Sequence, residues 1–234
     1  MVNKMSEIEW YSSGEKNDQW AAEVLDYKKE GYFIEIGACS GIRNSMCYSL
    51  EKYLDWNGIA VEPHSKYWKE CKEIRKIPVN ACIYDFDGEI DYLECEGKIP
   101  ERGWVAEGLS GIPHHLAPHH KHYHDRFGKL VKKQCISPST LLSTYNAPNQ
   151  IDFLAIDVEG AELNILTAWP WEEYPVTLIS VESGTEKSEL MIEEYLATQN
   201  YSRVINPFAQ VTWDACYCHN SFIDNYKYGR VTPD

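Results

Sequence analysis

Short apolar runs alternate with longer amphipathic segments along most of the chain. Such alternation is typical of α/β proteins, in which a strand of a mostly parallel sheet is followed by a helix that packs on it. The runs that we expect to be strands are residues 32–36, 58–61, 79–83, 151–156, 176–181, 201–205 and 212–217. Helices are expected at residues 44–54, 65–74, 139–145, 161–168 and 188–198. The last two strands leave little room for a helix between them, so they should pair antiparallel.

No repeat, low-complexity block or Gly/Ser-rich linker interrupts this pattern, so we expect a single domain of residues 1–234. Residues 97–133 are the exception, because glycine and proline are frequent there and six of the eight histidines fall within them. We expect this segment to be a His-rich insertion or lid. Before it, the dipeptide Asp87-Gly88 predicts a hairpin turn between residues 84–86 and 89–92.

The charge balance limits the classes of partner. Lys and Arg number 22 against 36 Asp and Glu, which gives a net charge of −14 and argues against nucleic acid or an anionic membrane surface. No apolar run approaches the length of a spanning helix, and the first residues lack the apolar stretch of a signal peptide. The eight cysteines show no CxxC pair and no disulfide-scaffold density. We therefore expect a cytoplasmic protein with reduced thiols, no nucleic-acid partner and no membrane association.

The first strand and its turn carry Glu35, Gly37 and Gly41, and another acid, Glu62, ends the next strand. In doubly wound sheets this turn lets a ligand approach the backbone, and an acid about 20 residues later bonds ribose hydroxyls. The spacing departs from G-x-G-x-x-G, and Glu35 would repel a phosphate. A cationic nucleoside such as S-adenosylmethionine therefore fits better than NAD. An NAD-dependent oxidoreductase of Rossmann fold stays the alternative function, and a purely structural turn stays the alternative for the glycines.

Carboxylates crowd the segment IDFLAIDVEGAEL, which contains Asp152, Asp157, Glu159 and Glu162, and Glu182 ends the following strand. Because neighbouring parallel strands lie about 4.8 Å apart, Asp157 and Glu182 should face each other at one edge of the sheet. Converging acids require a cation, a hydroxyl donor or solvent. Two hypotheses stay open. In the first, Asp157 and Glu182 hold a metal ion, Mg²⁺ or Mn²⁺. In the second, no metal is present, Asp157 or Glu159 is a general base, and Glu182 bonds an acceptor hydroxyl.

Taken in order, these motifs resemble the FkbM-type S-adenosylmethionine-dependent methyltransferases. The segments that carry the resemblance are YFIEIGACSG, LEKYLDWNGIAVEPHS, VNACIYDFDGE, IDFLAIDVEGAELNIL and LISVE. The resemblance implies a Rossmann-like class I methyltransferase fold, with a seven-stranded, mostly parallel sheet and an antiparallel last strand. It also implies an O-methyltransferase that acts on a hydroxyl of a small-molecule sugar or glycan. A homodimer stays open.

The resemblance also implies site residues. The expected cofactor-binding residues are Glu35, Gly37, Ala38, Cys39, Gly41, Glu62, Pro63, His64, Ala81, Cys82 and Asp157. Glu35, Gly37, Ala38 and Gly41 would line the methionine and ribose portions. Glu62 would hold the ribose hydroxyls, and the four residues after it in this list would surround the adenine. Asp157, Glu159 and Glu182 would face the transferred methyl group. Cys39 departs from the family, which usually has a small polar residue, often Asn, at this position.

The histidines of the insertion stand at positions 114, 115, 119, 120, 122 and 124. Imidazole is a ligand for transition metals, so a non-catalytic His-rich metal-binding protein is a further alternative function. However, Pro113 and Pro118 disrupt a helical presentation, and no cysteine pair joins the cluster. Two other interpretations of the histidines stay open. The segment is a solvated loop, or it is a lid that contributes a histidine to acceptor binding or proton transfer, with His115 as the candidate. Candidate platforms for a sugar ring are Trp104, Tyr123 and Trp169.

Overall fold

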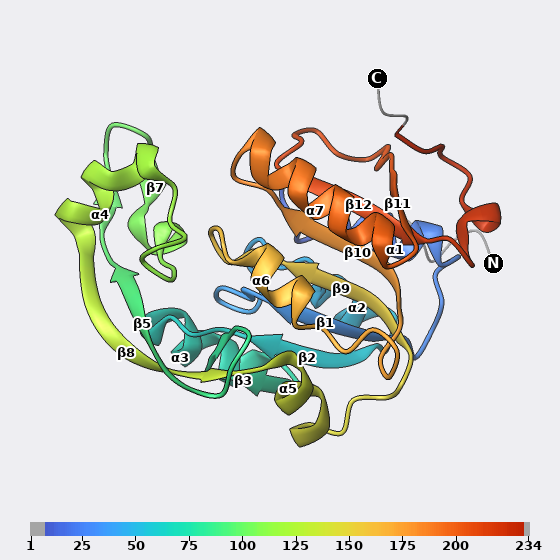
Figure 1. The fold of residues 1–234 in the computed structure, drawn as a ribbon, viewed down its shortest axis with the longest axis horizontal. Helices are drawn as coiled ribbons and strands as arrows, with labels where there is room; N and C mark the ends of the chain where they lie inside the picture. Colours follow the sequence, from blue (N-terminus) through green and yellow to red (C-terminus); the bar gives the residue numbers. More distant parts are fainter. Residues whose placement is uncertain (1–7, 232–234) are drawn as a thin grey trace.

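A seven-stranded sheet lies at the centre of the protein, in the order β11-β12-β10-β9-β1-β2-β3 (Figure 1). The computed structural model describes residues 8–231. The strands are β1 (Tyr32–Ile36), β2 (Asn57–Val61), β3 (Ile77–Val79), β9 (Ile151–Ile156), β10 (Val176–Glu182), β11 (Tyr201–Val204) and β12 (Asp214–His219). All neighbouring pairs are parallel except the two that include β12. The predicted α/β class with a mostly parallel seven-stranded sheet is confirmed.

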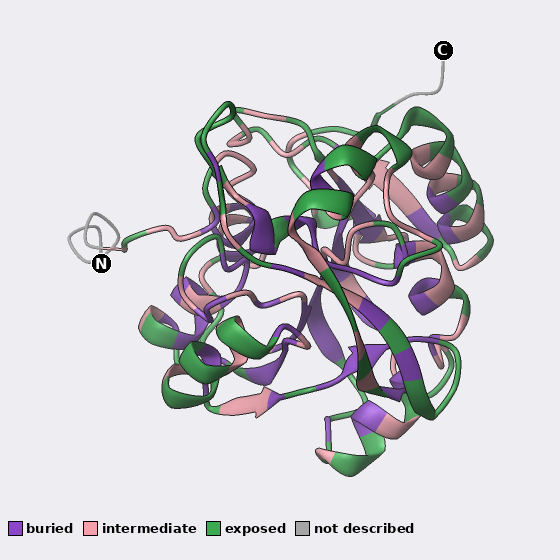
Figure 2. Ribbon diagram, turned by 90° about the vertical axis from the view of Figure 1, so that its left-hand side faces the viewer, coloured by how far each residue is buried: buried purple, intermediate pink, exposed green. Residues whose placement is uncertain are grey.

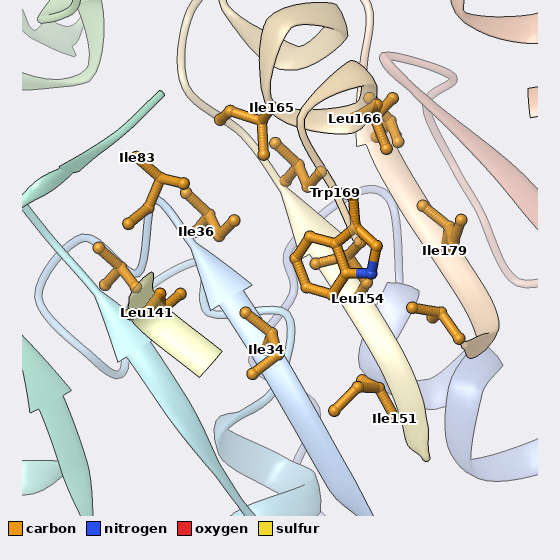
Figure 3. Packing of buried hydrophobic residues seen from close by; sticks show 14 of the residues in the cluster. Ile34, Ile36, Ile83, Leu141, Ile151, Leu154, Ile165, Leu166, Trp169 and Ile179 are labelled. Atoms are coloured by element: carbon orange, nitrogen blue, oxygen red, sulfur yellow. The ribbon is translucent and has the colours of Figure 1, made fainter. Parts of the chain in front are cut away.

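Helices cover both faces of this sheet. One face carries α1 (Asn17–Val24), α2 (Tyr48–Tyr53) and α3 (Ser65–Ile74), and the other carries α5 (Pro138–Thr144), α6 (Glu162–Thr167) and α7 (Glu186–Thr198). Successive strand residues point to opposite faces, so Phe33 packs with the α1 and α2 side while Ile34 and Ile36 pack with the other. Figure 3 shows Ile34 and Ile36 in the second of these layers, together with Leu154 and Trp169. A short 3₁₀ helix, η4 (Ile223–Asn225), follows β12.

No helix within residues 8–231 combines the length and the apolar character that a membrane crossing requires.

The expected strand at residues 79–83 is two strands in two sheets, so that prediction is wrong. β3 ends at Val79 in the central sheet, and β4 (Cys82–Ile83) pairs in parallel with β8 (Gly128–Ile136) in a separate three-stranded sheet. Between them, the Asn80 side-chain amide donates a hydrogen bond to the Glu62 carbonyl oxygen at 2.7 Å. This bond holds the chain at the end of β2 while it changes sheets.

The hairpin predicted at Asp87-Gly88 is also wrong. The carboxylate of Asp87 accepts hydrogen bonds from the Ser137 N–H and the Thr140 hydroxyl, both at 2.7 Å, at the start of α5. Gly88 then begins β5 (Gly88–Cys95), which pairs antiparallel with β8 instead of with residues 84–86. A contact 50 residues away in the chain therefore decides the conformation of this dipeptide.

Residues 82–136 form an arm beside the central sheet (Figure 1). Its long ribbon is the β5–β8 pair, which runs from Gly88 opposite Cys135 to Cys95 opposite Gly128. The tip carries the short elements β6 (Lys98–Ile99), β7 (Trp104–Val105), η2 (Ala106–Leu109), η3 (Pro118–His120) and α4 (Lys121–Phe127). Figure 2 views the molecule from this side and shows mixed burial along the arm, with the strands behind it mostly buried. The segment expected as an insertion, residues 97–133, thus includes residues 128–133 of β8, which belong to a regular ribbon.

Candidate active site

A cavity of about 250 Å³ lies at the carboxyl ends of β1, β2, β9 and β10, which face the arm (Figure 1). In open α/β sheets ligands bind at this edge. The central sheet contributes residues at and after the ends of β1, β2, β9 and β10, and the arm contributes residues 82, 83, 92, 107, 108, 110 and 112. Residues 12–15, 213 and 214 complete the wall. The cavity is therefore bounded by the core, the arm and both terminal parts of the described chain.

Gly37 allows the turn after β1 to touch the loop after β9. It has a φ of +96°, and a Cβ at this position would lie 1.9 Å from the Asp157 carbonyl oxygen. The N–H groups of Gly37 and Ala38 both donate to the Val61 carbonyl oxygen, at 3.0 and 2.9 Å. Only glycine provides this conformation together with this close approach. The turn thereby brings Cys39 and Glu62 into the wall of one cavity.

Glu35 does not line the cavity, which corrects the expectation that it contacts the cofactor. It is fully buried beneath the turn, where its Oε2 lies 2.5 Å from the Arg75 guanidinium. Its Oε1 accepts hydrogen bonds from the Met46 N–H at 2.6 Å and from the Ser45 hydroxyl at 2.8 Å. Because Met46 itself lines the cavity, Glu35 supports the wall from behind.

Ala38 and Gly41 likewise lie outside the cavity wall and pack against α3. Ala38 is buried with Ala60 and Cys71. Gly41 has a φ of +84°, and a Cβ there would lie 3.1 Å from the Cys71 Cα. These two residues allow α3 to approach the turn closely, so their contribution to a ligand site is indirect.

Glu62 and His64 stand where β2 passes into α3. Glu62 is buried, and its Oε1 accepts the His64 N–H at 2.7 Å. Burial raises the pKa of Glu62 to about 8, although hydrogen bonds from the backbone of His64 and Cys39 act in the opposite direction. His64 caps α3, since its Nδ1 accepts the Lys66 N–H at 3.2 Å, and its Nε2 bonds the Cys95 carbonyl oxygen of β5 at 2.9 Å. His64 therefore joins the ribose-binding candidate to the arm.

Asp157, Glu159 and Glu182 form the acidic cluster of the cavity. One carboxylate oxygen from each lies within 4.8 Å of the others, so Asp157 and Glu182 face each other as the strand order predicts. Burial raises the pKa of Asp157, which a hydrogen bond from Glu182 partly offsets. Burial and the charge of Asp157 raise the pKa values of Glu159 and Glu182 well above the usual range. The three acids therefore bind a proton more readily than isolated carboxyl groups do.

The other two acids of this segment have structural partners. Asp152 lies at the start of β9, the end of the strand that is remote from the cavity. Its carboxylate lies 2.7 Å from the Lys28 ammonium and accepts a hydrogen bond from the Tyr32 N–H at 2.9 Å. Glu162 begins α6, and its Oε1 accepts the N–H groups of Val158 at 3.2 Å and Gly160 at 2.9 Å. Glu162 thus fixes the loop that presents Asp157 and Glu159, an arrangement in which its charge also complements the helix dipole.

His115 packs on this loop through its backbone, not its ring. A Cβ on Gly160 would lie 2.3 Å from the His115 carbonyl oxygen, while the imidazole Nε2 bonds the Tyr84 hydroxyl at 2.8 Å. Burial and the neighbouring His114 lower the pKa of His115. Within residues 8–231, His115 is not among the residues that line the cavity, so its part in acceptor binding or proton transfer stays a prediction.

Two further expectations, a metal site built of histidines and aromatic platforms for a sugar ring, do not match the geometry. Within residues 8–231, the one group of three or more side chains with metal-binding geometry is the acidic cluster, which contains no histidine. Of the expected sugar platforms, Tyr123 and Trp169 are buried, and Trp104, at the tip of the arm, is not among the residues that line the cavity. The geometry does not favour a His-rich metal-binding protein.

The cavity has a strongly one-sided charge. Within the described chain its wall contains no lysine or arginine and seven carboxylates, those of Glu15, Glu62, Glu107, Asp157, Glu159, Glu182 and Asp214. Burial raises the pKa values of Glu15 and Asp214, the latter to about 8. Such a site attracts a cation and repels phosphate groups.

The family model described as the methyltransferase FkbM domain matches residues 35–203, from β1 to β11. The chain belongs to the FkbM methyltransferase family. This family comprises S-adenosylmethionine-dependent methyltransferases, so the chain is an enzyme of that class. A comparison with curated protein sequences finds no match.

Several solved structures are similar to this FkbM-family chain at low sequence identity and with TM-scores below 0.5. The METTL16 methyltransferase domain is 12% identical with a TM-score of 0.46, and the match covers 88% of this chain and 66% of that one. Human METTL16 in complex with SAH is 10% identical with a TM-score of 0.43, covering 88% and 69%. A methyltransferase from Pyrococcus furiosus is 14% identical with a TM-score of 0.40, covering 90% and 86%. The chain thus spans about two thirds of the METTL16 domains.

Several residues of the FkbM-family cavity were missed by sequence reasoning. Trp213 is 63% exposed at the cavity wall, and the adjoining Asp214 pairs with Glu182 across the β10–β12 ladder. The predicted antiparallel pairing was a usable signal, because it places the start of β12 at the carboxyl edge of the parallel strands. Glu15 and Glu107 carried no comparable signal, since they come from segments without a recognisable pattern.

Proposed function

We propose that this enzyme transfers the methyl group of S-adenosylmethionine to a hydroxyl of a sugar or glycan, with the cofactor in the acid-lined cavity. The observation that carries the proposal is the wall of seven carboxylates without a lysine or arginine, which suits a sulfonium cation. The same wall would repel the two phosphates of NAD, so the oxidoreductase alternative is disfavoured. A nucleic-acid acceptor is disfavoured for the same reason, together with the net charge of −14.

For the cofactor, the residues present form a coherent set. Gly37 and Cys39 lie on the turn after β1, and Glu62 presents a buried carboxylate for the ribose hydroxyls. Beside them, Pro63, His64, Ala81 and Cys82 also line the cavity and would surround the adenine. Glu35, Ala38 and Gly41 support this turn from behind. Bound S-adenosylmethionine supplies an electrophilic methyl group on a positively charged sulfur.

The acidic cluster is proposed to act on the acceptor. The acceptor oxygen bonds to the methyl carbon as the carbon–sulfur bond breaks, and the hydroxyl proton passes to a carboxylate. Asp157 or Glu159 is the proposed base, because burial raises the pKa of each and so makes it a stronger base than an isolated carboxylate. Holding the oxygen in line with the methyl group supplies on the order of 7–11 kcal/mol in well-oriented systems. Glu182 bonds an acceptor hydroxyl in this arrangement.

A divalent cation is the second proposal for the same three side chains. The separation of their oxygens, within 4.8 Å of one another, and their hard-oxygen chemistry favour Mg²⁺ or Mn²⁺ held by Asp157 and Glu182, with Glu159 completing the set. Chelation distinguishes the two proposals. Activity that survives exhaustive EDTA treatment and is not stimulated by added Mg²⁺ or Mn²⁺ rejects the metal, whereas loss and recovery with added metal rejects the metal-free arrangement.

A sugar acceptor and a lid role for the arm are supported by the mouth of the cavity. The indole of Trp213 is exposed beside Glu182 and Asp214, where a sugar ring can stack while its hydroxyls meet carboxylates. On the other side, Gly108 and Ser110 of the arm complete the wall. Deleting residues 114–124 should therefore raise the acceptor KM or lower turnover, and unchanged kinetics would reject the lid.

Cofactor binding is tested by calorimetry with S-adenosylhomocysteine. Wild type should bind in the low-micromolar range, and Glu62→Ala should bind at least tenfold more weakly, since charge-assisted hydrogen bonds contribute about 1.5–3 kcal/mol each. Glu70→Ala is the matched control, because Glu70 is an exposed glutamate on α3. Wild-type affinity in a folded Glu62→Ala protein would remove Glu62 from the site.

A further inference from the structure

Glu107 is a carboxylate of the arm of which only one oxygen has a partner. The residue belongs to η2, lines the cavity and is 3% exposed. Its Oε1 forms an ion pair with the Lys66 ammonium of α3, whereas Oε2 is buried without a hydrogen-bond partner among residues 8–231. A buried oxygen without a donor is destabilising, and a ligand that supplies the donor removes this cost. Because Glu107 also lines the cavity, its Oε2 is a candidate acceptor for a ligand.

The surroundings of Glu107 place it at the same end of the cavity as Glu62. Lys66 lies in the first turn of α3, directly after the β2 end that carries Glu62 and His64. Tyr67, one residue further, also lines the cavity. Its pKa is raised, mainly by burial and further by nearby charges that include Glu107 and Glu62. The two carboxylates thus approach one region of the cavity, Glu62 from the central sheet and Glu107 from the arm.

We propose that Glu107 Oε2 accepts a hydrogen bond from a ribose hydroxyl of the bound cofactor, so that core and arm hold the nucleoside between two carboxylates. The inference rests on the proposed function, because it takes the ribose of S-adenosylmethionine as the occupant. A vicinal diol offers two donors, and Glu62 and Glu107 offer acceptors from two sides. This contact makes the arm part of the cofactor site as well as of the acceptor site.

Lys66 keeps Glu107 suited to this role. Burial alone would raise the pKa of Glu107, but the hydrogen bond and charge of Lys66 outweigh it, and the net shift is downward. At neutral pH, Glu107 therefore stays ionised, whereas Glu62, with a pKa of about 8, is mostly protonated. An ionised acceptor forms the stronger hydrogen bond to a hydroxyl, and a phosphate at this end would be repelled.

Calorimetry with S-adenosylhomocysteine on wild type, Glu107→Gln and Lys66→Arg tests the contact. Glu107→Gln should weaken binding about tenfold, since it replaces a charged acceptor by a neutral amide of the same shape. Lys66→Arg keeps a cation beside Glu107 and with it the ionised carboxylate, so its affinity should change less than threefold. An equal loss in both variants would mean that Glu107 acts only through the ion pair, which overturns the inference. Circular dichroism verifies that each variant is folded.

Analogues of S-adenosylhomocysteine that lack the 2′- or the 3′-hydroxyl identify the donor. Wild type should lose about tenfold in affinity for one of them, and Glu107→Gln should no longer discriminate against that analogue. Equal discrimination by wild type and variant for both analogues overturns the inference while the proposed function stands. If wild type does not bind S-adenosylhomocysteine at all, the proposed function itself fails.

Discussion

A buried cluster of charges beneath the candidate site makes Arg75→Met the most informative stability variant. Arg75 is 4% exposed, and its Nη1 lies 2.5 Å from Glu35 Oε2 while its Nε lies 2.7 Å from Glu51 Oε2. Removing the guanidinium leaves two buried carboxylates without a cation. The loss of one partner from a buried ion pair typically costs about 3–5 kcal/mol.

The corresponding change in melting temperature follows from the size of the protein. Methionine fills much of the space of the arginine side chain, so the loss is mainly electrostatic. For domains of 150–250 residues, 1 kcal/mol shifts Tm by about 2–4 °C, so Arg75→Met should lower Tm by about 6–20 °C. The double variant Glu35→Gln/Arg75→Met removes one of the stranded charges and should be more stable than Arg75→Met alone.

Thermal unfolding followed by circular dichroism at pH 7 measures this effect. Arg126→Met is the matched control, because the Arg126–Glu101 pair has 58% and 47% of its side chains exposed and contributes little. The reasoning is refuted if Arg75→Met lowers Tm no more than the control does, or if the double variant is less stable than Arg75→Met.

Three further predictions concern the turn and the ribose acceptor. Affinity for S-adenosylhomocysteine should rise as pH increases from 6 to 8, because Glu62, with a pKa of about 8, must lose its proton to accept hydroxyls; Glu62→Gln should show less of this dependence in pH-resolved calorimetry. Gly37→Ala should destabilise the fold by about 3 kcal/mol or more in urea unfolding, because its Cβ would lie 1.9 Å from the Asp157 carbonyl oxygen, and a loss below 1 kcal/mol would contradict this. Cys39→Asn should keep cofactor binding and raise the unfolding midpoint, since Cys39 has a φ of +49° and asparagine tolerates that conformation better; a lower midpoint would contradict it.

The central sheet was predictable because its strands are buried on both faces. β9 is buried at every position, and such a strand appears in the sequence as a continuous apolar run. The facing of Asp157 and Glu182 then follows from strand order alone, since both end neighbouring parallel strands. Local pattern and topology agree at these positions, so sequence reasoning was sufficient.

The arm and the details of the site depend on contacts between residues far apart in the chain. Asp87-Gly88 has the sequence of a hairpin turn, but Asp87 instead binds the start of α5. Glu35 has the sequence position of a ligand contact, yet its carboxylate accepts a hydrogen bond from Arg75, 40 residues later. A single sequence does not reveal whether an acid at a strand end meets a ligand or a buried arginine. Trp213 was missed because its exposure depends on how β12 meets β10.

The most direct test of the central claim is a crystal structure of this chain with S-adenosylhomocysteine. The account predicts one ligand in the acid-lined cavity, with its ribose hydroxyls within hydrogen-bonding distance of the Glu62 carboxylate. Its sulfur should face Asp157, Glu159 and Glu182. Ligand density at another place, or a ribose that does not contact Glu62, would contradict the account.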